Sequence, residues 1–130
     1  MTIQSGALVL VHLANPTEKF WGTLDRLETV GVTFRGISLD SFEEWVTELA
    51  RHEPSGLGLA TMFVPLFRVE RIFLDEQVGE VESYRRRFER RVGERVEKFV
   101  QVGGADSSDD VPAVGERFDP SDPSDGGNVF

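Results

Sequence analysis

The feature that most restricts how this chain can fold is the stretch TMFVPLFRVERIFLDE, residues 61–76, which has a proline in its middle. The stretch is apolar enough for a strand, but Pro65 has no N–H to donate and is excluded from central strands. We therefore interpret it as two strands, residues 57–64 and 68–75, joined by a tight corner at 65–67. Two short strands that meet at a corner are typical of a small, strongly curved sheet.

The chain before this stretch supplies three more strands. Residues 7–14, ALVLVHLA, are apolar on both faces, which is typical of a strand that is covered on both sides. Residues 20–28 and 32–39 are separated by Thr-Val-Gly, a length and composition suited to a hairpin. The apolar positions of residues 32–39 change parity at Arg35-Gly36, and this change predicts a β-bulge there.

Two amphipathic helices are expected. Residues 40–52, between the third and fourth strands, have apolar side chains on one helical face and begin with a capping box at Asp40 or Ser41. Residues 79–100 have apolar side chains at steps of three or four, with Gly93 as a weak point. A small barrel has little surface for so long a helix, so part of this stripe is predicted to contact another subunit. The candidate interface residues are Tyr84, Phe88, Val92 and Val96.

Charge and composition divide the chain of 130 residues into a body, residues 1–101, and a tail, residues 102–130. The tail is rich in Gly, Pro, Ser and Asp and carries seven acidic residues and one arginine, a net of −6 out of the total of −9. The body therefore carries −3. Such a tail buries too little apolar surface to offset its ordering entropy, so we expect a disordered acidic tail, with docking of a protein partner on it as an alternative.

The remaining composition points to a cytoplasmic protein. There is no cysteine, no basic residue precedes the apolar run at the N-terminus, and the longest nearly apolar run, residues 57–67, is about half of what spans a bilayer. We therefore expect no disulfide, no secretory signal and no membrane partner.

The predicted pattern is similar to that of the small SH3-like barrels, and among these it most resembles the Sm-like (LSm) family. The resemblance covers residues 5–76 and is carried by Gly22 in WGTL, by Phe34 to Gly36 in FRG and by PLFRV at the corner. It implies a five-stranded barrel and assembly into rings, in which the fourth strand of one subunit pairs with the fifth strand of its neighbour, usually with RNA bound. The Arg-Gly does not directly precede the last strand here, so no RNA-binding residue is carried over.

No constellation of residues indicates catalysis, a metal or a cofactor. His12 lies in an apolar strand and His52 ends a helix, and neither has a second histidine or a cysteine at ligand spacing. The aromatic residues of the strands and first helix are interpreted as core rather than as a ligand pocket. These residues are Trp21, Trp45, Phe63, Phe67 and Phe73.

The most prominent polar feature is an arginine cluster formed by Arg85, Arg86, Arg87, Arg90 and Arg91. It is a candidate contact for phosphates or for the acidic tail. The interleaved glutamates favour a face neutralised by ion pairs such as Glu82–Arg86 and Arg90–Glu94, and no aromatic residues are interleaved for base stacking. The sequence therefore predicts a non-enzymatic, self-assembling interaction module that forms a homo-oligomer. An Sm-like RNA-binding ring is the alternative, although RNA binding is not favoured.

Overall fold

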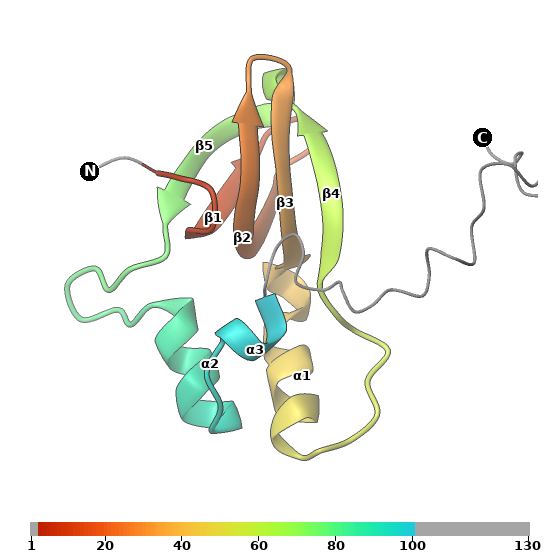
Figure 1. Cartoon of the computed structure of the whole chain (residues 1–130), viewed down its shortest axis with the longest axis vertical. Helices are drawn as coiled ribbons and strands as arrows, with labels where there is room; N and C mark the ends of the chain where they lie inside the picture. The colour runs from red at the N-terminus through yellow and green to blue at the C-terminus, as the bar shows by residue number, and fades with distance from the viewer. Residues whose placement is uncertain (1–2, 101–130) are drawn as a thin grey trace, which may run out of the picture. The chain divides into compact units, whose positions relative to one another are not determined.

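The computed structural model describes residues 3–100, which contain one antiparallel sheet of five strands (Figure 1). The strands are β1 (Leu8–Leu13), β2 (Glu18–Glu28), β3 (Gly31–Ser38), β4 (Ala60–Pro65) and β5 (Val69–Leu74). Their order in the sheet is β4-β3-β2-β1-β5. The prediction of a mainly β fold with five strands is confirmed, and the structure shows that all the strand pairings are antiparallel. The predicted boundary between body and tail, and the tail itself, lie outside the described residues.

The corner at Pro65 separates β4 from β5 as predicted, through a single turn of 3-10 helix, η1 (Leu66–Arg68). The predicted closure into a barrel is wrong. The corner carries the chain from one margin of the sheet to the other, so β4 pairs with β3 and β5 pairs with β1. Pro65 also has no N–H to donate to a ladder between β4 and β5, whose pairing would close the barrel. Within residues 3–100, the five strands therefore form a curved sheet whose two outer edges, on β4 and β5, have no further strand paired with them.

The predicted bulge at Arg35-Gly36 is also wrong. The pairing of β3 with β2 is regular at these two residues, and the register shift lies in β2, between Leu24 and Arg26. The parity of the apolar residues changes because the two faces of β3 are covered by different groups. Phe34 faces a cluster enclosed by the sheet, whereas Ile37 faces the helices.

Two glycines allow β2 and β3 to approach closely where this change occurs. Gly22 pairs directly with Gly36. A Cβ added to Gly22 would overlap the carbonyl oxygen of Arg35, and one added to Gly36 would overlap that of Trp21. Only glycine fits at these two paired positions. Close packing of β2 against β3 therefore explains Gly22 in WGTL and Gly36 in FRG.

The predicted helix between the third and fourth strands is confirmed as α1 (Leu39–Ala50). Its N-cap is Ser38, whose Oγ accepts a hydrogen bond from the N–H of Asp40, so the helix begins before the predicted capping box. Phe42, Trp45 and Val46 are its buried residues. The sequence pattern places these three residues and Leu49 on the apolar face, and Leu49 is partly buried against the same cluster.

The predicted single helix over residues 79–100 is wrong. The chain forms α2 (Tyr84–Val92) and the short α3 (Glu97–Val100). Gly93 ends α2 in the left-handed conformation, with φ of 82°, and its N–H donates to the carbonyl of Glu89. A glycine at this position is a typical helix C-cap, and the turn after it lets α3 fold back against the same apolar surface.

The sheet has a separate apolar cluster on each face. The sheet-side cluster contains side chains from both edge strands, so the sheet curves around it. Its buried residues are Val9, Val11, Leu13, Leu24, Val32, Phe34 and Val64. The helix-side cluster joins Trp21 and Ile37 to all three helices. Its other buried residues are Phe42, Trp45, Val46, Phe88, Val96 and Val100. In Figure 1 the helices lie together below one end of the sheet and leave the other end uncovered.

No helix within residues 3–100 has the length and apolar character needed to cross a membrane.

Candidate interaction surface

The four candidate interface residues of the last helical region, Tyr84, Phe88, Val92 and Val96, all contact the helix-side cluster of the same chain. Phe88 and Val96 are completely buried in the helix-side cluster, and Tyr84 and Val92 pack against it. Phe88 lies with its ring centroid 5.2 Å from that of Trp45 and 6.4 Å from that of Trp21. Phe88 and Val96 therefore have no exposed surface to offer a second subunit. Tyr84 and Val92 stay partly exposed, so a subunit contact through these two residues stays a prediction.

Four members of the arginine cluster are held in ion pairs. Arg85 contacts Glu89 and Glu97, and Arg90 contacts Glu82. These pairs differ from the predicted Glu82–Arg86 and Arg90–Glu94 pairs, because α2 is short and its neighbours come from other turns. Within residues 3–100, no ion pair involves Arg86, which is exposed.

The other two pairs attach α2 to α1. Arg87 and Arg91 both reach Glu43 of α1, at 2.6 and 3.1 Å, and Arg91 also donates to the hydroxyl of Thr47. Arg85 holds the pKa of Glu97 down at about 2 through a hydrogen bond of 2.8 Å. Four of the five arginines are therefore held in an intramolecular ion-pair network, part of which joins α2 to α1 and α3. This arrangement leaves the arginine cluster little free positive charge for phosphates.

One residue that the sequence analysis did not single out connects the sheet to α2. The carboxylate of Asp75, just after β5, accepts hydrogen bonds from the indole N–H of Trp21 at 3.0 Å and from the backbone N–H groups of Tyr84 and Arg85 at 2.7 and 2.8 Å. A carboxylate at a helix N-terminus satisfies orphan donors and interacts favourably with the helix dipole. No spacing rule joins residues 21, 75 and 84, so only the fold brings them together.

The two histidines lie apart and are unlike. His12 of β1 is half-buried, with its ring centroid 4.8 Å from that of Phe73. Burial, together with the charges of Lys19 and Arg71, lowers the pKa of His12. His52 is exposed after the end of α1. Within residues 3–100, no group of three or more histidine, aspartate or glutamate side chains is arranged to hold a metal ion.

The aromatic residues that were interpreted as core divide into two groups. Trp21 and Trp45 are buried as expected, whereas Phe63, Phe67 and Phe73 are exposed. Phe67, in η1, has 87% of its surface accessible to solvent. The sequence pattern could not distinguish the groups, because an aromatic residue beside a proline corner is equally consistent with a core position.

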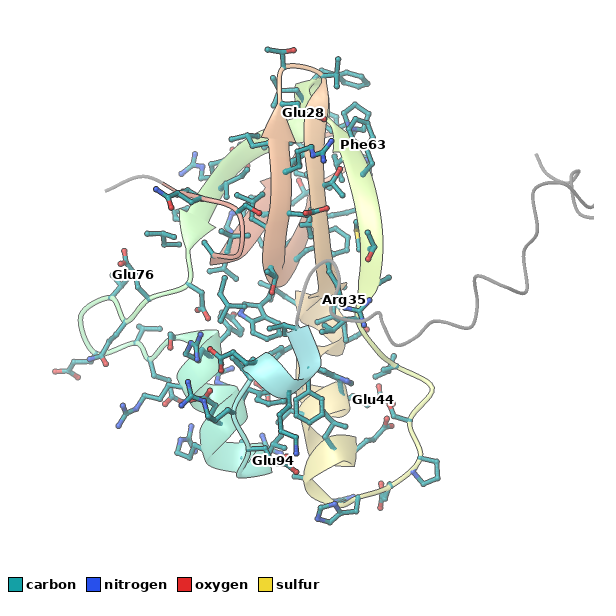
Figure 2. The ribbon with its side chains drawn as sticks, viewed as in Figure 1. Glu28, Arg35, Glu44, Phe63, Glu76 and Glu94 are labelled. Atoms are coloured by element: carbon teal, nitrogen blue, oxygen red, sulfur yellow. The ribbon has the colours of Figure 1, made fainter. Side chains whose placement is uncertain are left out.

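An apolar end, which we define as Val30, Phe63, Leu66 and Phe67, forms where the β2–β3 hairpin meets the corner. The N–H of Leu66 donates to the carbonyl of Val30 at 3.0 Å. A Cβ on Gly31 would lie 2.7 Å from Cε1 of Phe63, so the phenyl ring covers that glycine. All four residues of the apolar end are exposed. In Figure 2, Phe63 and Glu28 are seen at the end of the sheet away from the helices.

Comparison with known proteins adds no relative to this picture: no family model, no curated protein and no solved structure matches the chain. The candidate site therefore depends on the geometry of this chain alone. That geometry consists of the apolar end and the two open sheet edges that adjoin it.

Proposed function

We propose that this chain is a cytoplasmic, non-enzymatic interaction module that assembles with further copies of itself, and that the apolar end takes part in the contact. The observation that carries the proposal is the exposure of two phenyl rings, Phe63 and Phe67, on the two sides of the corner at Pro65, where the backbone of Leu66 is hydrogen-bonded to that of Val30. Exposed apolar residues that adjoin one another mark interaction surfaces, and aromatic residues are enriched at such interfaces.

The energetics favour covering this surface. Burial of one exposed phenylalanine side chain stabilises by roughly 1.5–3 kcal/mol. The body of the chain carries a formal charge of only −3, so repulsion between two bodies is small. The arginine cluster, the main alternative surface, is already occupied by glutamates.

The experiment is light scattering of the full chain at low and high salt. We expect a mass that is a small multiple of 14.6 kDa and is independent of salt. Phe67→Glu should reduce the mass to that of a monomer. The matched control is Val81→Glu, because Val81 is 67% exposed but lies outside the apolar end. A monomeric wild-type chain, or equal effects of the two variants, would contradict the proposal.

A second candidate function is an Sm-like ring that binds RNA. The strand order favours it, since β4 and β5 lie at opposite margins of the sheet and each has an open edge for the neighbouring subunit. A ring of this family predicts five to seven subunits, and RNA binding that weakens steeply as salt rises. A mass of that size together with salt-sensitive binding of a labelled oligonucleotide would support this candidate over the first.

A further inference from the structure

The two open edges of the sheet are unlike in charge. β5 reads VERIFL and carries Glu70 and Arg71, whereas β4 reads ATMFVP and carries no charge. Edge strands of native proteins are usually protected against pairing with another chain by charged residues, bulges or prolines. On β4 the only such residue is Pro65, at its end. The β4 edge is therefore the one that is open to another strand.

The hydrogen-bonding groups on the open side of β4 follow from its register. Because Leu66 donates to Val30 and pairing groups alternate along an antiparallel strand, Met62 and Val64 direct their N–H groups toward β3. Thr61 and Phe63 therefore direct theirs away from it. Pro65 falls in the outward set, so its missing N–H removes nothing from the pairing with β3. Within residues 3–100, no strand pairs with this side of β4.

We propose that β4 of a second copy adds to this edge in antiparallel orientation, so that two sheets join across a twofold axis with Phe63 opposite Phe63. The proposal rests on the proposed function and names its interface. Cross-strand partners point to the same face, so odd-numbered residues must pair with odd-numbered ones. Centring on Phe63 puts Thr61 opposite Pro65 of the second copy. Each Thr61 N–H then meets a Pro65 carbonyl, and each Phe63 N–H meets a Phe63 carbonyl.

A second copy suits this edge better than the β5 edge of a neighbour does. Self-pairing of β4 places no like charges opposite each other, because the strand has none. It also sets two phenyl rings side by side, and aromatic cross-strand pairs stabilise a sheet. Pairing of β4 with β5 would instead place the Phe63 region against Glu70 and Arg71. The apolar end continues the same margin, so Leu66 and Phe67 are available to extend the contact.

Crosslinking through introduced cysteines tests the register directly. The chain has no cysteine, so Phe63→Cys supplies the only thiol. Phe63→Cys removes the phenyl pair but keeps the backbone hydrogen bonds of the edge, so we expect a short bismaleimide, added at a protein concentration at which light scattering shows that this variant still associates, to convert it into a covalent dimer. The matched control, Glu70→Cys on the β5 edge, should remain uncrosslinked. If a mixture of the two variants gives mixed Phe63→Cys/Glu70→Cys dimers instead, β4 pairs with β5 and the inference is overturned.

A second variant tests the hydrogen bonds. Thr61→Pro removes an outward N–H and leaves the pairing with β3 in place, and its fold is checked by tryptophan fluorescence. We expect the dimer dissociation constant to rise about tenfold or more, and Thr61→Val, which keeps the N–H, to leave it unchanged. Suppose that the wild type is an oligomer, that Thr61→Pro does not change its dissociation constant and that the Phe63→Cys variant gives no crosslink. This result overturns the inference about β4 but not the proposed function. A monomeric wild type overturns both.

Discussion

A single carboxylate, that of Asp75, ties the helical layer to the sheet through three hydrogen bonds. Hydrogen bonds to a charged group contribute more than neutral ones, and loss of a helix cap costs about 1 kcal/mol by itself. We expect Asp75→Ala to lower the free energy of unfolding by roughly 2–3 kcal/mol, measured by urea denaturation with tryptophan fluorescence. Glu76→Ala, at the exposed neighbouring position, should change it by less than about 0.5 kcal/mol. Equal effects of the two variants would contradict the assigned role.

Glu97 gives a residue-scale prediction for pH. Its pKa in the folded chain, about 2, lies below the ordinary value of 4.5 because of Arg85. A lowered folded-state pKa adds stability above about pH 4.5, and this stability is lost as the pH falls toward 2. The carboxylate is half exposed, so Glu97→Gln should cost no more than about 1 kcal/mol at pH 7. Unfolding measured at several pH values should show the two proteins converging near pH 2.

The control for Glu97 is Glu80→Gln, since Glu80 is exposed and makes no ion pair with any residue from 3 to 100. Its stability difference from the wild type at pH 7 should be small. A Glu97→Gln difference that stays constant from pH 7 to pH 2 would show that the Arg85 contact does not set the ionisation of Glu97.

At the scale of elements, Gly93 decides whether residues 79–100 form one helix or two. A continuous helix predicts that Gly93→Ala stabilises by about 1 kcal/mol. The observed φ of 82° predicts the opposite, a loss of about 1–2 kcal/mol, because alanine is strained in the left-handed region. Gly58→Ala is the matched control: neither glycine has an atom within 4 Å of an added Cβ, and only Gly93 has a positive φ. Thermal or urea unfolding of both variants measures whether each substitution raises or lowers the free energy of unfolding.

At the scale of the whole molecule, salt distinguishes an apolar contact from an ionic one. The full chain carries a formal charge of −9, so copies repel one another, and this repulsion is strongest at low salt. Screening is effective beyond about 10 Å at 0.1 M salt and does not weaken apolar burial. We expect the association constant from sedimentation to stay constant or rise between about 0.05 and 0.5 M salt. Dissociation at the higher concentration would indicate an interface built on ion pairs.

Periodicity and turn chemistry in the sequence were sufficient for the local elements. Proline chemistry at residue 65, the hairpin signal at residues 29–31 and the apolar face of α1 each act over a few neighbouring residues, so they predicted five strands and one helix in the observed order. The same local rules failed at Gly93, where a helical period continues through a residue that ends the helix. The spacing of apolar residues is the same whether residues 79–100 form one straight helix or two helices joined by a turn.

The sequence by itself therefore determined the strands, the corner and α1, because their causes are local. Only the tertiary structure decided the rest: the sheet stays open, Phe88 and Val96 are buried while Phe63 and Phe67 are exposed, and four of the five clustered arginines are paired with Glu43, Glu82, Glu89 and Glu97. These outcomes depend on which distant residues meet, as Trp21, Asp75 and Tyr84 do. Side-chain identity specifies what a residue can contact, and the path of the chain specifies which contacts are within reach.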